Sequence, residues 1–165
     1  MNLTHIDEEG RAKMVDVGAK AETERKAAAQ AIVLLNEETM RLLREKALPK
    51  GDALGCARIG GILAAKKTPE LVPLCHSLYL TYVGVDFEIL DAPPRIRIVA
   101  EARCKGRTGV EMEAIIAAQT SAAIIYDMCK AVQRDIIISD VKLLYKSGGK
   151  SGEFKAPESG CSDIR

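Results

Sequence analysis

The stretch at residues 106–132 constrains the fold most, because its composition predicts one long apolar helix. It reads G-R-T-G-V-E-M-E-A-I-I-A-A-Q-T-S-A-A-I-I-Y-D-M-C-K-A-V. Glu111 and Glu113 stand near the helix N-terminus and Lys130 near its C-terminus, where the helix dipole stabilises each charge. Asp127 is different, because a carboxylate in the last turn of an apolar helix breaks a local rule. Such breaks are typical of functional sites.

The rest of the chain predicts a two-layer α+β domain. Helical spacing and strand alternation predict two further helices and three strands, at 37–46 and 52–67, and at 78–90, 95–104 and 136–145. The turn D-A-P-P joins two of these strands in a hairpin. The alanines of 23–35 favour a helix, yet the segment also fits the period of a strand, so both stay open. This order indicates one antiparallel sheet covered by helices.

Length and charge bound the class of protein. A chain of 165 residues suits one domain, and its polar ends at 1–13 and 152–165 are predicted to be mobile tails. The net charge of +1 argues against general binding to nucleic acid or acidic membranes. The sequence shows neither a signal-peptide pattern nor an apolar run of membrane-spanning length, so we expect a cytoplasmic protein.

Cysteine and histidine usage argues against a metal site. The five cysteines form an odd set without a C-x-x-C pair, which is typical of neither a disulfide framework nor a zinc site. Two histidines are too few for a histidine-rich metal centre. We therefore expect free cysteines and no bound metal.

Lys50-Gly51-Asp52 lies at the start of the second predicted helix and supports two interpretations. In the structural one, Gly51 makes a turn and Asp52 caps the helix N-terminus. In the functional one, Lys50 is a mobile charge beside helix N–H groups that can bind phosphate. The segment V-P-L-C-H-S at 72–77 is similarly open. His76 can be a hydrogen-bonded structural residue, or it can contact a polar ligand and move a proton near neutral pH.

The glycine-rich segment K-S-G-G-K-S-G at 146–152 invites comparison with a phosphate-binding P-loop. The first glycine of that motif is replaced by Leu144, and no helical pattern follows, so the P-loop interpretation fails. A flexible basic loop that closes over an anion and a plain solvated tail remain the alternatives.

The spacing along the long helix limits what one chain can bind. Glu113 and Asp127 are fourteen residues apart, which places them within roughly 40° of the same face and about 21 Å apart along the axis. Lys130 is three residues beyond Asp127 and can pair with it. A small ligand cannot bridge Glu113 and Asp127. Either the ligand is extended, or the site is assembled between subunits.

Seven motifs together resemble the molybdenum cofactor biosynthesis protein C family. They are M-V-D-V at 14–17, A-K-A-E-T at 19–23, K-G-D at 50–52, P-L-C-H at 73–76, G-V-E-M-E-A at 109–114, Y-D-M-C-K-A-V at 126–132 and K-S-G-G-K-S-G at 146–152. The resemblance runs from about residue 3 to residue 155. It implies a ferredoxin-like fold in which 23–35 is the first strand. It also implies a homohexamer, a trimer of dimers, with active sites between subunits.

The same resemblance implies the activity of a cyclic pyranopterin monophosphate synthase. The implied substrate is 3′,8-cyclo-7,8-dihydro-GTP, and the implied products are cyclic pyranopterin monophosphate and pyrophosphate. No metal, flavin or nicotinamide cofactor is implied, because the reaction involves no redox change.

The implied catalytic residues are Asp127, Lys50 and Lys130, because ring rearrangement needs a positioned acid or base. A lysine flanked by another cation can have a lowered pKa, which would suit this role. The implied substrate-binding residues are Lys66, Arg25 and Lys146 for the leaving pyrophosphate, Leu74, Cys75 and His76 as a contact segment, Glu111, Met112 and Glu113 at the pterin end, and Asp16.

Two positions depart from the family pattern. Gly18 stands where the family usually has serine, and Ser77 stands where it usually has proline. Two other classes of protein compete with this interpretation. A non-catalytic nucleotide-binding regulatory module on the same fold would need no lysines around an aspartate, and an RNA-recognition module would carry stacking aromatics on its strands.

Overall fold

Residues Thr23–Leu34 form a strand, β1, in spite of their alanines. In the computed structural model, which describes residues 5–157, β1 lies inside an antiparallel sheet between strands β3 (Pro94–Gly106) and β4 (Ile137–Ser147). Ala27, Ala29 and Ala31 are fully buried in the core, and the residues between them are more exposed or face the other side of the sheet. Pairing on both edges of β1 therefore overrides the helical propensity of alanine. The strand implied by the family resemblance is confirmed.

The sheet has the order β2-β3-β1-β4-β5, and all its neighbouring strands are antiparallel. The remaining strands are β2 (Leu80–Asp91), β3 (Pro94–Gly106), β4 (Ile137–Ser147) and β5 (Phe154–Lys155). β2 and β3 form the predicted hairpin. β1 pairs with β3 over its whole length without a register shift.

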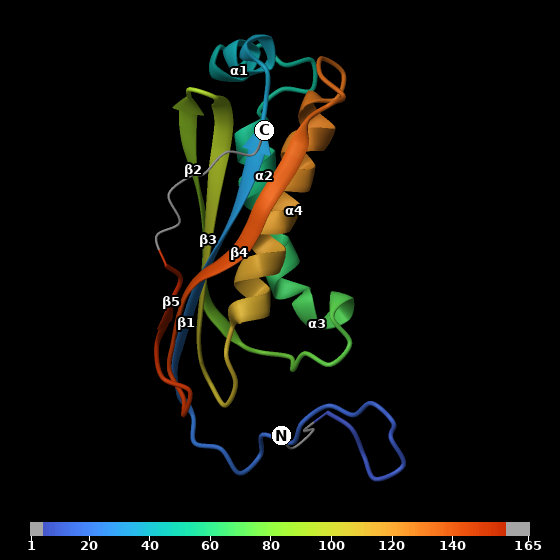
Figure 1. Cartoon of the computed structure of the whole chain (residues 1–165), viewed down its shortest axis with the longest axis vertical. Coiled ribbons are helices and arrows are strands. Elements are labelled where there is room, and N and C mark those ends of the chain that lie inside the picture. Colours follow the sequence, from blue (N-terminus) through green and yellow to red (C-terminus); the bar gives the residue numbers. More distant parts are fainter. Residues whose placement is uncertain (1–4, 158–165) are drawn as a thin grey trace.

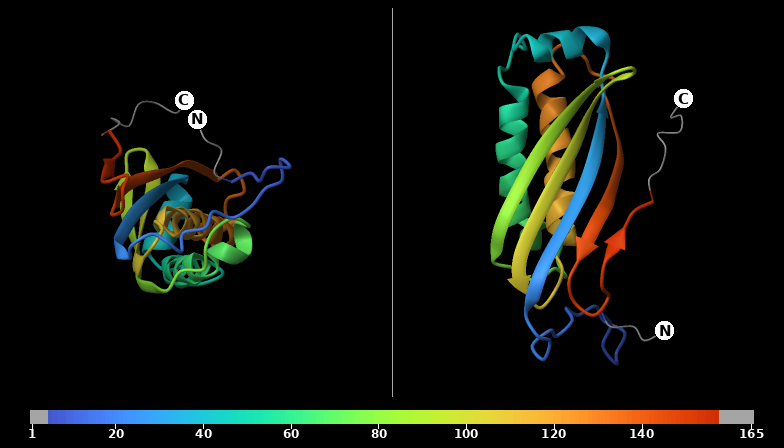
Figure 2. Two further views of the ribbon diagram at one scale, coloured as in Figure 1. Left: turned by 90° about the horizontal axis from the view of Figure 1, so that it is seen from below. Right: turned by 90° about the vertical axis from the view of Figure 1, so that its left-hand side faces the viewer.

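Four helices complete the domain: α1 (Glu37–Arg44), α2 (Ala53–Lys66), α3 (Thr68–Leu71) and α4 (Glu111–Cys129). Figures 1 and 2 show α2 and α4 side by side on one face of the sheet. The order β1, α1 and α2, β2, β3, α4, β4 and the strand order are those of a ferredoxin-like α+β fold, as predicted. Within residues 5–157, no helix is long and apolar enough to cross a membrane.

Small residues bring α2 and α4 together in antiparallel orientation. Ser121 of α4 donates a hydrogen bond of 3.0 Å to the carbonyl oxygen of Ala57 on α2. A Cβ atom at Gly61 would lie 2.1 Å from the Ser121 hydroxyl, so only glycine permits this approach. Because the two helices run in opposite directions, the C-terminal end of α2 with Lys66 lies at the same end of the domain as the start of α4.

The ends of the chain carry some regular structure within the predicted tails. Ile6 pairs with Ala12 in an isolated antiparallel bridge, and the short strand β5 pairs with β4. Figure 1 shows the N-terminal segment crossing the end of the domain below α3 and the start of α4. Four cysteines, at positions 56, 75, 104 and 129, are free thiols, and Cys161 lies outside the described residues.

Candidate active site

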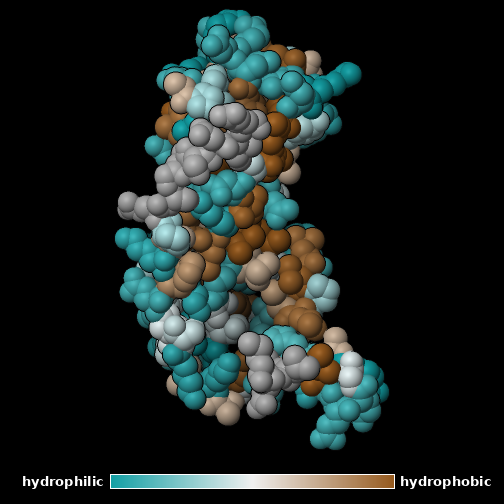
Figure 3. Space-filling view, in the orientation of Figure 1, coloured by the Kyte–Doolittle hydropathy of each residue, from teal (hydrophilic) through white to brown (hydrophobic). Residues whose placement is uncertain are grey.

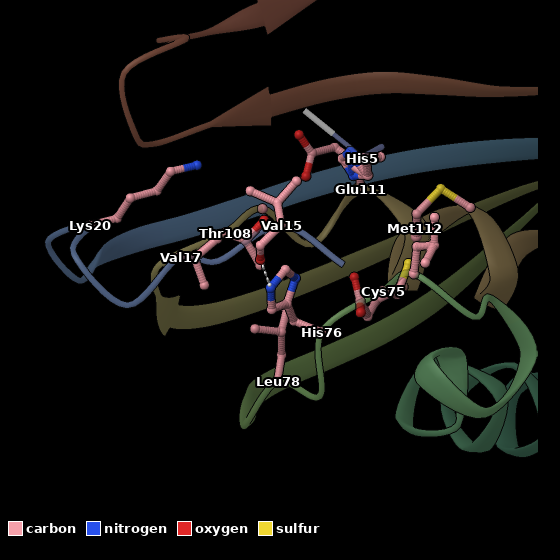
Figure 4. Close-up of a pocket in the computed structure, with 13 residues that line it drawn as sticks. His5, Val15, Val17, Lys20, Cys75, His76, Leu78, Thr108, Glu111 and Met112 are labelled. Atoms are coloured by element: carbon pink, nitrogen blue, oxygen red, sulfur yellow. Dashed lines mark hydrogen bonds between the residues drawn. The ribbon is translucent and has the colours of Figure 1, made fainter. Parts of the chain in front are cut away.

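A pocket of about 410 Å³ lies at the N-terminal end of α4. Its walls come from the N-terminal segment, the segment that precedes β2, and the first turn of α4 (Figure 4). The pocket is lined by Leu74, Cys75, His76, Glu111, Met112 and Glu113, together with His5, Val15, Val17, Lys20, Leu78, Thr108 and Gly109. The structure thus brings six of the residues predicted to bind substrate around one cavity.

Glu113 is the buried carboxylate of this pocket, with a relative exposure of 3%. Burial, with a smaller contribution from the charge of Glu111, raises the pKa of Glu113 to about 6 against the opposing effect of a backbone hydrogen bond. Burial also raises the pKa of the Cys75 thiol, with a contribution from Glu113. The pocket therefore holds a carboxyl group that changes protonation near neutral pH, beside a thiol that stays protonated.

His76 contacts the N-terminal segment. Its Nε2 lies 2.7 Å from the carbonyl oxygen of Val15, in a hydrogen bond that Figure 4 draws as a dashed line. A carbonyl oxygen only accepts, so Nε2 is the donor and carries a proton. His76 is thus a hydrogen-bonded structural residue, and it also lines the pocket.

A second cluster lies at the other end of α4. The Asp127 carboxylate receives a hydrogen bond of 2.7 Å from Lys50 Nζ, and Lys130 Nζ lies 2.7 Å from its other oxygen. These bonds, from Lys130 first and Lys50 second, lower the pKa of Asp127 to about 2. The pKa of Lys130 is raised by the same pairing. The expectation of a lowered lysine pKa is therefore wrong for Lys130, because a carboxylate lies between the two cations.

Local structure explains how Lys50 reaches Asp127. Asp52 caps α2 by accepting a hydrogen bond of 2.9 Å from the backbone N–H of Gly55. Gly51 has a φ of +88°, which favours glycine, and turns the chain just before the cap. The structural interpretation of Lys50-Gly51-Asp52 is confirmed, and it places the lysine against the end of α4.

The structure does not bring the two clusters together within one chain. Glu113 lies in the first turn of α4 and Asp127 in its last, about 21 Å apart along the helix. In Figure 1 the start of α4 lies near α3, whereas its end lies near α1. One chain therefore presents a pocket and a charged cluster at opposite ends of the same helix.

Two of the predicted phosphate ligands lie at the pocket end. Lys146 Nζ is 3.3 Å from the Glu111 carboxylate and 2.6 Å from the Ser151 hydroxyl, so it connects α4 to the glycine-rich loop. Arg25 is 9% exposed, and its Nε donates a hydrogen bond of 3.1 Å to the carbonyl oxygen of Gly106. A plain solvated tail does not fit residues 146–149, which are half-buried, with Gly148 and Gly149 packed beside Arg25, whereas residues 150–152 are exposed.

Lys66 and Asp16, like Lys146 and Arg25, are not among the residues that line the pocket. Lys66 is exposed at the end of α2, where it makes no ion pair with any residue of 5–157. The Asp16 carboxylate accepts a hydrogen bond of 2.7 Å from the backbone N–H of Gly18, which makes a local turn in the N-terminal segment. Among the described residues, no group of three or more His, Cys, Asp or Glu side chains could hold a metal ion.

The family model described as the MoaC family matches residues 14–149. The chain belongs to the MoaC family. A relative from Desulfovibrio desulfuricans, named cyclic pyranopterin monophosphate synthase, is 64% identical over 95% of this chain and 96% of its own length. Relatives of the same name from Nitratidesulfovibrio vulgaris and Roseiflexus are 57% and 52% identical, each over 93% of this chain and 96% and 97% of their own lengths.

Several pocket residues of this MoaC-family chain are not predicted from its sequence. The structure adds a wall made by the N-terminal segment, with Val15, Val17 and Lys20 facing the cavity. The signal was present in M-V-D-V and A-K-A-E-T, since the two valines alternate with outward residues. The sequence does not predict where this segment lies in the fold, because a loop has no periodic pattern that indicates which surface it covers. A Cβ at Gly18 would lie 3.0 Å from the Asp16 carboxylate, which is the end of an exposed side chain.

Proposed function

We propose that this chain acts as a cyclic pyranopterin monophosphate synthase, a lyase of molybdenum cofactor biosynthesis. It converts 3′,8-cyclo-7,8-dihydro-GTP to cyclic pyranopterin monophosphate and pyrophosphate. One observation carries the proposal: the Asp127 carboxylate is held between two ammonium groups at 2.7 Å. It occurs in a chain that is 64% identical to a protein named for this activity.

Acid–base chemistry falls to the Asp127 cluster in this proposal. Its carboxylate is ionised at neutral pH, and the pairing keeps Lys130 protonated. Substrate N–H groups that bind Asp127 compete with the lysines for its lone pairs. That competition lowers the pKa of Lys130 toward its usual value and makes its proton easier to transfer. Asp127 thus holds the lysines in place and releases them when substrate binds.

The pterin end of the substrate belongs in the pocket. A volume of about 410 Å³ is in the range of small-molecule sites. A guanine-type edge presents adjacent N–H donors, and the carboxylate oxygens of Glu111 and Glu113 are acceptors for them. Met112 and Leu74 supply apolar surface for the faces of the rings.

Phosphate cyclisation needs positive charge around the leaving group. In that step a substrate hydroxyl oxygen forms a bond to the α-phosphorus, the bond from this phosphorus to the bridging oxygen breaks, and pyrophosphate leaves. The hydroxyl proton passes to a base in the site. Lys146, Arg25 and Lys66 are assigned to the developing charge on pyrophosphate. Asp16 belongs to the turn that leads into this region.

The distance between the two clusters supports a shared site. We propose a homohexamer, a trimer of dimers, in which the pocket of one subunit faces the Asp127 cluster of another. A two-fold axis that pairs α4 helices in opposite directions would bring these ends together. Figure 3 shows apolar surface over α4 and β4, and Ile137 of β4 is 51% exposed. A neighbouring subunit would cover such surface.

The test supplies the cyclised GTP substrate and measures pyrophosphate and cyclic pterin together. Wild-type protein should release both in equal amounts, and Lys50→Ala should release neither at a comparable rate. Arg44→Ala is a matched control, because it removes a half-exposed cation from an ion pair of 2.6 Å elsewhere on the surface. Equal rates for Lys50→Ala and wild type would contradict the assignment.

A further inference from the structure

The N-terminal segment is attached to the pocket by a hydrogen bond that spans 61 positions of sequence. His76 Nε2 donates this bond to the carbonyl oxygen of Val15 at 2.7 Å, at a partly buried location. The acceptor is a main-chain atom, so the bond fixes the path of the segment whatever the side chain at position 15. Figure 4 shows the bond, with Val17 and Lys20 further along the same segment.

The segment forms a wall of the pocket rather than part of the folded core. Val15 and Val17 are half-buried and line the cavity. The neighbouring Met14 does not line it and is 51% exposed to solvent. Its secondary structure is limited to an isolated bridge between Ile6 and Ala12 and to local turns. A wall with so few backbone hydrogen bonds to the sheet opens at low cost.

We propose that residues 13–20 are a strap across the substrate pocket and that His76 is the positioning residue that latches it. The latch holds the two valines against the cavity and keeps Lys20 at its edge. Nε2 of the imidazole thus serves to position the segment, and this role deepens the proposed function because the segment closes the site. Its effect on substrate binding rests on that function, whereas its effect on the strap does not.

Two substitutions of His76 distinguish the loss of the hydrogen bond to Val15 from the loss of the imidazole ring. His76→Gln keeps an N–H donor near the position of Nε2, whereas His76→Leu keeps bulk without a donor. His76→Asn is a second variant without the latch, because its shorter amide lies nearer the main chain. Circular dichroism confirms that each variant is folded before it is compared.

Limited trypsin digestion without substrate measures directly how often the strap detaches from the pocket. Cleavage after Lys13 and Lys20, followed by mass spectrometry, should be about fivefold faster in His76→Leu and His76→Asn than in wild type, the expected effect of losing one hydrogen bond. His76→Gln should resemble wild type. Cleavage after Lys150, in the exposed turn at the other side of the site, is the internal control and should not change.

Kinetics with the cyclised GTP substrate give the second measurement. His76→Leu should raise KM about fivefold with kcat within twofold, and His76→Gln should restore KM. Equal cleavage after Lys20 in all variants would overturn the latch, even if the chain proved to have another activity. A large loss of kcat in His76→Gln, with an intact strap, would overturn it too, because the ring itself would then act on the substrate.

Discussion

The ammonium group of Lys50 donates a hydrogen bond of 2.7 Å to the Asp127 carboxylate, 77 positions further along the chain. The contact joins the entry of α2 to the last turn of α4. Together with Lys130 it keeps Asp127 ionised, with a pKa of about 2. The carboxylate at an unfavourable helix terminus is thus stabilised by two cations, which compensate the unfavourable effect of the helix dipole.

Replacing Asp127 with asparagine should abolish most of the activity with little change in folding. Asn has nearly the same shape but cannot hold two ammonium groups by charge, so kcat should fall on the order of 100-fold to 10,000-fold. Asp127 is half-exposed, so the melting temperature should change little. Asp86→Asn, which changes an exposed carboxylate of β2, is the control. Full activity in Asp127→Asn would remove Asp127 from the mechanism.

Glu113 should make stability depend on pH. Its pKa in the folded protein is about 6, against an ordinary value of 4.5, so the folded state binds the proton more tightly. The free energy of unfolding should therefore decrease by about 2 kcal/mol as pH rises from below 4.5 to above 6, and then level off. Urea unfolding at several pH values measures this slope.

Glu113→Gln should lack that slope, because glutamine carries no titrating proton. Glu153→Gln is the control, since this exposed carboxylate lies on the loop before β5. The result that contradicts the prediction is a wild-type slope retained in Glu113→Gln. An acidic limb of kcat/KM near pH 6 should disappear in the same variant, since Asp127 titrates far below that pH.

The cap of α2 should contribute to stability and to the position of Lys50. Asp52→Ala removes the acceptor for the Gly55 N–H and should lower the free energy of unfolding by about 1 kcal/mol. Asp52→Asn keeps an acceptor and should lose only a few tenths of that amount. Chemical denaturation compares the two variants. A similar loss in both would show that the charge, rather than the hydrogen bond, is what stabilises this end of α2.

The glycine-rich loop offers a matched pair of substitutions. Gly148 and Gly152 both have positive φ angles, of 100° and 64°. A Cβ at Gly148 would lie 2.2 Å from the carbonyl oxygen of Glu24, whereas a Cβ at Gly152 meets nothing within 4 Å. Gly152→Ala should therefore cost only the backbone strain, about 1 kcal/mol.

Gly148→Ala should have the larger effect, because the clash is with main-chain atoms next to Arg25 and the loop must move. We expect KM for the substrate to rise about tenfold in Gly148→Ala and less than twofold in Gly152→Ala. Steady-state kinetics decide this. Identical KM values in the two variants would show that the packing of the loop beside Arg25 does not matter for binding.

The sequence predicted the elements whose residues repeat with a clear period. The hairpin of β2 and β3 and the helix α4 lie close to their expected bounds, since packing against one core repeats every second or every third to fourth residue. β1 was different, because alanine is small enough to be buried in either structure. Only the pairing of Thr23–Leu34 with two neighbours decides for a strand, and this is a long-range property.

The site was predictable to a different extent at each end of α4. The separation of Glu113 and Asp127 followed from helix geometry alone. The contact between Lys50 and Asp127 came only from a family resemblance, because no local pattern links residues so far apart. The wall formed by Val15 and Val17 was missed for the same reason, since what a loop covers depends on the tertiary fold.

Mixing two inactive variants tests the central claim most directly, namely that the Glu113 pocket and the Asp127 cluster of different subunits form one site. Asp127→Asn and Glu113→Ala are each purified, then unfolded together and refolded as mixed oligomers, and pyrophosphate release is measured. If sites are shared across a two-fold axis, mixed dimers contain one intact site, and activity should return to about a quarter of wild type. In the control, each variant is unfolded and refolded by itself, and the two are combined only afterwards. If every site lies within one chain, the refolded mixture stays as inactive as the two variants, and the account is wrong.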